Sequence, residues 1–231
     1  MNKLIQLLIS AVFLTIPLCA NANIIKDVNL TLDARTPTGY IQTGSAPYNV
    51  YLDYDVKLEG ETAWREAFCV EDANAIDGST YKYTLLTVDS GLSSVGLDAD
   101  KYLKAAAIAQ YYWDNYEGQS NEYTMKAAAQ IAIWEMMFED DNNGFDLSAG
   151  NFQTGSYNTE ALGIWNSVQF IPASSNEWVL AVNPTITAGE PIQVQNYQNY
   201  LVRYSVPEPA SLVLFGLGLL GLAGIGRKGK K

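Results

Sequence analysis

Residues 49–58 carry the pattern that most restricts how this chain folds. Apolar side chains occupy every second position from Val50 to Leu58, and polar side chains such as Asp53 and Asp55 occupy most positions between them. Because successive side chains of a strand point to opposite faces, the alternation predicts a β-strand with one face on a core and the other in solvent. By their β-forming composition, further strands are predicted at residues 64–70, 81–88, 177–182 and 192–206.

The middle of the chain predicts helices instead. Asp98 is suited to cap a helix that runs to about Tyr116, and Asn121 to cap a second helix through roughly Phe138. Strands are predicted on both sides of this segment, so residues from about 98 to 139 form a helical insertion. The expected class is α+β: an antiparallel β-sandwich or barrel-like sheet with an inserted helical subdomain.

The N-terminus has the three zones of a secretory signal peptide. One lysine is followed by an apolar run and by Ala20-Asn21-Ala22, whose small residues fit cleavage after Ala22. Residues 1–22 are therefore expected to be removed, and Cys19 with them. The predicted mature domain, residues 23–206, keeps a single cysteine, Cys69.

The C-terminus, residues 207–231, has the form of a sorting signal. Pro207-Glu208-Pro209 precedes an uncharged apolar run at residues 210–226, which is followed by a basic tail. The run predicts a transmembrane helix, with the basic tail on the cytoplasmic side. The order of tripeptide, span and tail resembles the PEP-CTERM signal of Gram-negative bacteria. This resemblance implies recognition by an exosortase and display at the cell surface or in the extracellular matrix.

The residue inventory removes several classes of function. The chain has no histidine, which excludes Ser-His-Asp and Cys-His catalysis and ordinary zinc sites. Its net charge of −11 argues against nucleic-acid binding. An acidic stretch at residues 139–146 resembles a calcium loop, but Glu139 and Gly150 occupy its two end positions, where other residues are required. We therefore expect no metal and no cofactor.

Gln130 is an unexpected residue on the second predicted helix. Together with Tyr123, Ala127, Trp134 and Met137 it falls on one apolar stripe, because the spacings are 4, 3, 4 and 3. A buried amide without hydrogen-bond partners costs about 1–3 kcal/mol, so Gln130 needs a partner. The ordinary explanation is a glutamine at the edge of the stripe that is hydrogen-bonded to the backbone.

Two short motifs, taken together, resemble those of bacterial surface thioester domains. Phe68-Cys69-Val70 lies on a predicted strand, and Ala129-Gln130-Ile131-Ala132-Ile133-Trp134 lies on a predicted helix. In that family the cysteine and the glutamine join in an internal thioester with loss of ammonia. The resemblance implies that Cys69 and Gln130 form the reactive bond, that Trp134 shields it on one side, and that Trp64 and Phe68 close the other.

Such a bond implies covalent capture of a lysine amine or a hydroxyl group on a partner protein or polysaccharide. Three alternatives remain at this stage. One is a non-covalent protein that binds exopolysaccharide or matrix and keeps Cys69 as a buried thiol. The second is a thioester that is only a structural link, and the third is a secreted hydrolase that uses two carboxylates.

Overall fold

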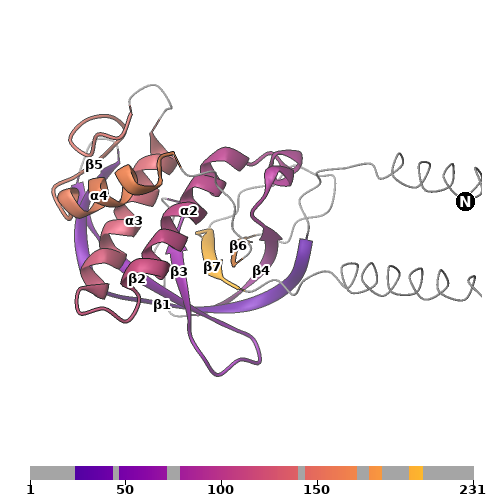
Figure 1. Ribbon diagram of the computed structural model, residues 1–231. Coiled ribbons are helices and arrows are strands. Elements are labelled where there is room, and N and C mark those ends of the chain that lie inside the picture. The colour runs from indigo at the N-terminus through magenta and orange to yellow at the C-terminus, as the bar shows by residue number, and fades with distance from the viewer. Residues whose placement is uncertain are drawn as a thin grey trace, which may run out of the picture.

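One antiparallel sheet organises the computed structural model, which describes residues 24–43, 47–71, 79–139, 144–170, 177–183 and 198–204. The strands run in the order β2-β3-β7-β6-β4-β1-β5, and β2 also pairs with β1, which closes the sheet into a ring. Figure 1 shows β1 sweeping round one side of this ring. The strands are β1 (Ile24–Thr43), β2 (Pro47–Leu58), β3 (Arg65–Cys69), β4 (Thr80–Thr87), β5 (Phe152–Thr154), β6 (Trp178–Val182) and β7 (Tyr200–Arg203).

The inner face of the ring is apolar and aromatic. Tyr54 on β2, Tyr83 on β4 and Tyr200 on β7 meet there, with ring centroids 6.0 Å apart for Tyr54 and Tyr200 and 6.2 Å apart for Tyr83 and Tyr200. Cys69 is the register partner of Tyr200, so its side chain lies on the same face. The predicted alternation on β2 explains this arrangement, because it directs Tyr54 and its apolar neighbours inward.

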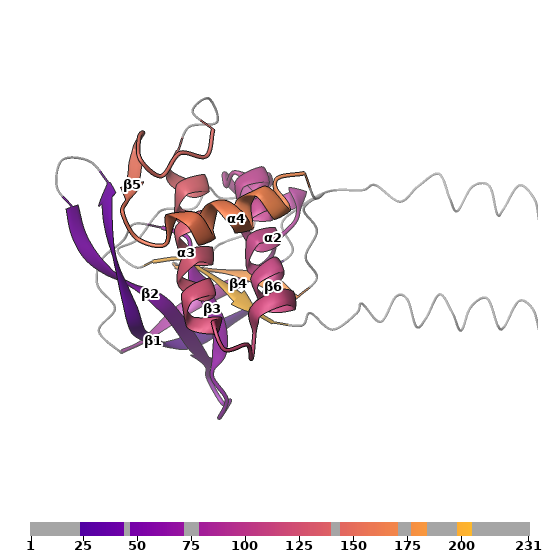
Figure 2. The same ribbon diagram turned by 60° about the vertical axis from the view of Figure 1, so that its left-hand side comes forward.

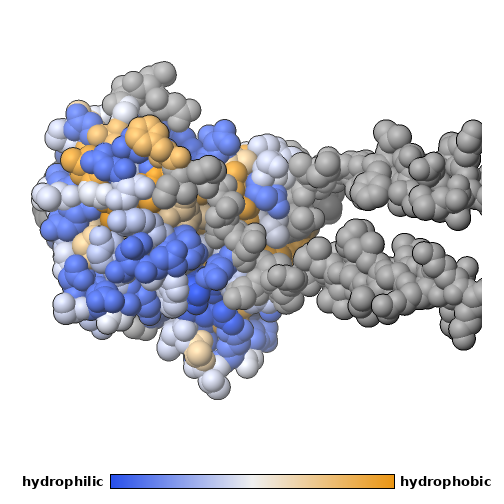
Figure 3. All heavy atoms as spheres, viewed as in Figure 1, coloured by the Kyte–Doolittle hydropathy of each residue, from blue (hydrophilic) through white to orange (hydrophobic). Residues whose placement is uncertain are grey.

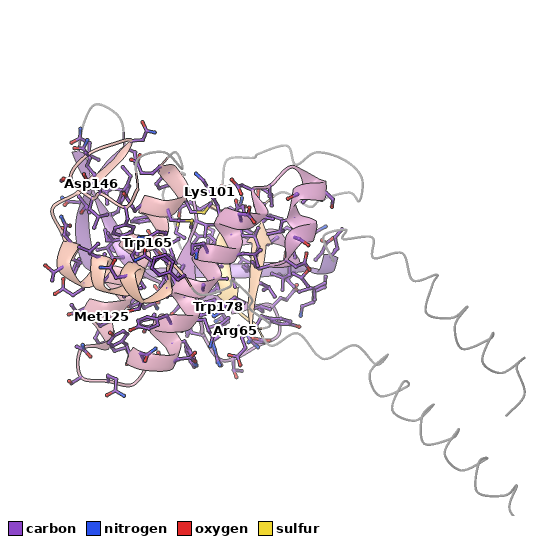
Figure 4. All side chains as sticks on the ribbon, turned by 45° about the horizontal axis from the view of Figure 1, so that its top comes forward. Arg65, Lys101, Met125, Asp146, Trp165 and Trp178 are labelled. Atoms are coloured by element: carbon purple, nitrogen blue, oxygen red, sulfur yellow. The ribbon has the colours of Figure 1, made fainter. Side chains whose placement is uncertain are left out.

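Helices pack against one side of the ring (Figure 2). They are the 3₁₀-helix η1 (Ser90–Val95) and the α-helices α2 (Ala99–Tyr116), α3 (Glu122–Phe138) and α4 (Asn158–Val168). Asp98 caps α2 by accepting a hydrogen bond from the Lys101 amide at 3.2 Å. The Lys101 ammonium donates to the carbonyl of Glu139 just beyond α3, at 2.7 Å, so α2 and α3 are antiparallel. Lys101 and Met125 accordingly lie at opposite ends of the helix pair in Figure 4.

The α+β class and the antiparallel barrel-like sheet agree with the sequence prediction. The predicted strands at residues 49–58, 64–70, 81–88 and 177–182 correspond to β2, β3, β4 and β6, and the predicted helices to α2 and α3. The prediction of a separate helical subdomain is not confirmed, since α2 and α3 share one continuous hydrophobic core with the sheet. Of the strand predicted at residues 192–206, Tyr200–Arg203 form β7, and residues 192–197 and 205–206 lie outside the described chain.

Both predicted terminal signals lie outside the described residues. This applies to the signal peptide at residues 1–22, to Pro207, Glu208 and Pro209, and to the predicted span at residues 210–226. Within the described ranges, no helix has the length and apolar character needed to cross a membrane. The boundaries of the predicted domain at residues 23–206 therefore stay predictions.

Candidate functional site

Cys69 is the last residue of β3 and is fully buried. β3 pairs with β2 from Arg65 to Ala67 and with β7 from Ala67 to Cys69. Pairing with β2 therefore ends two residues before Cys69. At that point a side chain from α3 takes the place of a strand partner.

This side chain is the amide of Gln130, which is also fully buried. Its Oε1 accepts a hydrogen bond from the Cys69 backbone N–H at 2.9 Å, and its Nε2 donates to the Cys69 backbone carbonyl at 2.7 Å. The two bonds satisfy the polar groups of both residues in a site that excludes water. They explain why an amide is tolerated on an apolar stripe of α3, where each unpaired group would cost about 1–3 kcal/mol.

The two residues singled out in the sequence are therefore brought together by the fold. The ordinary explanation for Gln130, a bond to backbone, is correct, but the residue sits at the centre of the core and its backbone partner is Cys69 itself. Tyr123, at the start of the predicted stripe, is 63% exposed and Met137, at its end, is half-buried, so the stripe is buried at Ala127, Gln130 and Trp134.

The thiol of Cys69 lies among groups that burial keeps neutral. Its Sγ donates a hydrogen bond to the Glu71 carbonyl at 2.9 Å, and Cys69 is in no disulfide. Burial raises the pKa of Tyr102 and of Tyr200 well above the usual tyrosine range, and the neighbouring Cys69 and Glu71 raise both further. These phenols therefore remain protonated around the thiol.

Hydrogen bonds between three strands fix the chain just after Cys69. Burial raises the pKa of Glu71, while a hydrogen bond from the Asn199 amide to its carboxylate opposes the shift. The backbone carbonyl of Asn199 accepts a hydrogen bond from the Val70 backbone N–H at 3.0 Å, and its Oδ1 accepts one from the Asn183 backbone N–H at 2.9 Å. The ends of β3, β6 and β7 are thereby joined beside the thiol.

Trp134 and Phe68, which were expected to shield the bond, are both buried, and their shielding role stays a prediction. Trp134 is 2% exposed, and its ring packs edge-on against Tyr54 with centroids 6.4 Å apart. Phe68 points to the opposite face of β3 from Cys69, where its ring lies 5.7 Å from that of Tyr112 and 5.6 Å from that of Trp178.

Trp64, the third residue expected to shield the bond, lies at the other end of β3 from Cys69. It precedes β3, whereas Cys69 is the last residue of that strand, and it stays 40% exposed with its ring 4.9 Å from the Lys57 ammonium. Trp64 instead helps to line a cavity of about 310 Å³, together with Trp113, Arg65, Arg203, Asp55, Glu66, Glu117 and Ala63.

A second group of buried polar residues centres on Lys126, one helical turn before Gln130, and it was not predicted from the sequence. Lys126 on α3 is 3% exposed and contacts the carboxylates of Asp53, Asp55 and Glu66. Burial opposes its charge, but the three carboxylates outweigh burial and raise the pKa of Lys126. The alternation on β2 placed Asp53 and Asp55 in solvent, and this was wrong: α3 covers them.

Carboxylates also gather near the cavity and at the end of α3. Oxygens of Glu66, Glu117 and Glu122 lie within 4.8 Å of one another. Glu139, the first residue of the calcium-like stretch, instead accepts a hydrogen bond from the Phe152 amide at 2.6 Å. Residues 140–143 of that stretch lie outside the described chain, so the expectation that it holds no metal stays untested.

The comparison with protein families decides the destination of the chain. Residues 205–228 match the PEP-CTERM protein-sorting motif. The protein is therefore exported and is sorted by an exosortase to the cell surface, as the C-terminal sequence predicted. No curated protein and no solved structure matches the chain.

Proposed function

We propose that this surface protein bonds covalently to a partner through an internal thioester between Cys69 Sγ and Gln130 Cδ. The observation that carries the proposal is the pair of hydrogen bonds, 2.9 and 2.7 Å, that hold the Gln130 amide on the backbone of Cys69. A nucleophile and its electrophile on one buried pair of residues are favoured to react, because the held geometry replaces a bimolecular encounter.

The same hydrogen bonds suit formation of the thioester. Cys69 Sγ attacks Gln130 Cδ, and negative charge develops on Oε1, to which the Cys69 N–H already donates. A donor aimed at developing charge in a dry site lowers the barrier. The C–N bond then breaks, the thiol proton passes to the departing Nε2, and ammonia leaves as the C–S bond is completed.

Enclosure by aromatic side chains preserves such a bond. A thioester open to water is hydrolysed, whereas Trp134, Tyr54 and Tyr200 surround this site and leave almost no exposed surface. The fold thus supports a bond that is stored until a suitable nucleophile reaches it.

Capture consumes the thioester. The neutral amine of a partner lysine, or a hydroxyl group, attacks Gln130 Cδ, the C–S bond breaks, and the proton of the nucleophile passes to Cys69 Sγ. The product is an amide or ester bond between Gln130 and a surface or matrix protein or polysaccharide. Each domain reacts once, so the protein acts in adhesion or matrix attachment and is not a turnover enzyme, and the chemistry needs no cofactor.

Methylamine tests this proposal directly. The purified chain is incubated with methylamine, and peptides are then mapped by tandem mass spectrometry. We expect an N-methyl amide at Gln130 and a newly titratable thiol at Cys69, and neither product in Cys69→Ala. An unmodified Gln130 beside a thiol that titrates before any amine is added contradicts the proposal.

A non-covalent matrix-binding protein is the second candidate, and the cavity beside Trp64 is the observation that favours it. Its volume of about 310 Å³, two tryptophan rings and several charged side chains resemble the general make-up of small-ligand sites. This candidate predicts that Trp64→Ala weakens binding to purified exopolysaccharide and that Cys69→Ala does not. The covalent proposal predicts that Cys69→Ala abolishes attachment that survives denaturant.

A further inference from the structure

The environment of Lys126 is unusual for a buried ion cluster. Its Nζ is in contact with Asp53 Oδ1, lies 2.5 Å from Glu66 Oε2 and 3.2 Å from Asp55 Oδ1, and donates to the Tyr54 carbonyl at 3.1 Å. One ammonium thus faces three carboxylates in a place where water is largely excluded. Burial of ions is expensive unless the charges are balanced, so this arrangement favours any step that removes charge.

We propose that Lys126 Nζ and Asp53 Cγ condense to an amide, an isopeptide bond that joins α3 to β2, with Glu66 transferring a proton. Asp53 is the acceptor because it contacts the amine directly and, with 2% of its surface exposed, is the most buried of the three carboxylates. Within the described residues, its Oδ1 has the Lys126 ammonium as its polar contact and accepts no other hydrogen bond.

The reaction balances without any added reagent. The Lys126 ammonium passes one proton to Glu66 and becomes a neutral amine, which attacks Asp53 Cγ. One carboxylate oxygen then leaves as water, taking the proton held by Glu66 and a second proton from the nitrogen. Ammonium and carboxylate become amide and water, so one positive and one negative charge disappear from the core.

Glu66 is placed to carry this proton, although the raised pKa of Lys126 means that the neutral amine forms only transiently. Burial raises the pKa of Glu66 to about 7, although Lys126 opposes the shift, so the group both accepts and releases a proton near neutral pH. The Tyr54 carbonyl and the rigid strand β2 keep the amine at the carboxylate, which supplies the proximity that an uncatalysed condensation lacks.

The isopeptide bond is independent of the thioester. It would lie one helical turn before Gln130, so that α3 would be joined to β2 at Lys126 and to β3 at Gln130. Within the described residues Cys69 forms no disulfide, so a second covalent link would give this exported protein the stability that disulfides provide elsewhere. Unlike a thioester, an amide is not opened by amines.

Intact mass in denaturant separates the two bonds, because the isopeptide removes water and the thioester removes ammonia. The full chain is purified with its own signals, and terminal peptides identify its ends. We expect the wild-type mass to fall short by one water at Lys126, whether or not ammonia is also lost. Treatment with methylamine should add the mass of one methylamine at the thioester and should leave the loss of water unchanged.

Matched variants assign the water loss. Lys126→Arg keeps the positive charge but is expected to abolish the loss, Glu66→Gln to abolish or greatly slow it, and Asp55→Asn to leave it intact. A wild-type mass that shows no loss of water overturns the proposal, and so does a loss of water that persists in Lys126→Arg. If Lys126→Arg fails to fold, tandem mass spectrometry of the wild type decides: a peptide pair joined at Asp53 and Lys126 supports the bond, and linear peptides with both residues unmodified refute it.

Discussion

Replacing Gln130 should cost much more stability than replacing Cys69, although each change removes the thioester. Gln130→Met roughly keeps the volume of the side chain but leaves the Cys69 N–H and C=O without the partners they have at 2.9 and 2.7 Å. Cys69→Ala keeps both hydrogen bonds, because they involve the backbone of residue 69. The difference between the variants therefore isolates the two bonds.

The magnitude follows from the burial of these groups. Cys69 and Gln130 are both fully buried, so each orphaned backbone group costs about 1–3 kcal/mol. Losing the buried thiol in Cys69→Ala offsets this by about 1 kcal/mol. We expect Gln130→Met to unfold with a free energy lower than that of Cys69→Ala by roughly 1–5 kcal/mol.

Urea unfolding at pH 7, followed by tryptophan fluorescence and by far-UV circular dichroism, measures this difference. Coincident transitions from the two signals establish two-state behaviour. Gln130→Glu is the matched control, since a protonated carboxyl group still accepts from the Cys69 N–H and donates to its carbonyl, and its stability should recover as the pH falls. Equal stabilities for Gln130→Met and Cys69→Ala would refute the reasoning, because the amide would then contribute nothing to the fold.

Three further predictions concern the same core. Opening the thioester with methylamine breaks a link between residues that are 61 positions apart. By analogy with disulfides, this should lower the free energy of unfolding by up to about 4 kcal/mol in urea titrations. An unchanged urea midpoint would contradict a crosslink. Trp134→Ala should accelerate hydrolysis of the thioester, measured with a thiol reagent as the appearance of the Cys69 thiol. Trp134→Phe should not, because the indole N–H has no hydrogen-bond partner among the described residues and the aromatic ring alone excludes water. Burial, with Glu139 and Asp146 nearby, raises the pKa of Glu135 to about 7 from 4.5, so the folded state holds this proton more tightly than the unfolded state. The stability that this proton provides is present below pH 4.5 and is lost as the pH rises through about 7. Glu135→Gln should therefore be more stable than the wild type at pH 8, by up to roughly 3 kcal/mol, and similar to it at pH 4.5, in urea titrations at the two values; a difference that does not change with pH would exclude this origin.

Local patterns predicted the elements that position the site. Alternation identified β2, and capping residues with apolar spacing placed α2 and α3 to within a residue or two, because these signals depend on the segment alone. The pairing of Cys69 with Gln130 was predicted from two short motifs, each of which marks a residue that is out of place in its surroundings.

Features that depend on tertiary packing were missed or wrong. The alternation on β2 predicted that Asp53 and Asp55 face solvent, because nothing in the local sequence shows that α3 brings a lysine against them. One feature of the sequence could have indicated the ion cluster. Lys126 lies one turn before Gln130, on a mostly apolar side of the helix. Trp64 was assigned to the shield because it is aromatic and near Cys69 in sequence, but it lies beyond the opposite end of β3 from Cys69.

The most direct test of the central claim is the intact mass of the untreated Lys126→Arg chain, in which no water can be lost at residue 126. We expect a mass lower than that of the sequence by one ammonia and no titratable thiol after unfolding at low pH. Lys126→Arg combined with Cys69→Ala should have the full mass of its sequence. A full mass together with a freely titrating thiol at Cys69, in a chain that is folded, would show that Gln130 only satisfies the backbone of Cys69 and that no thioester forms.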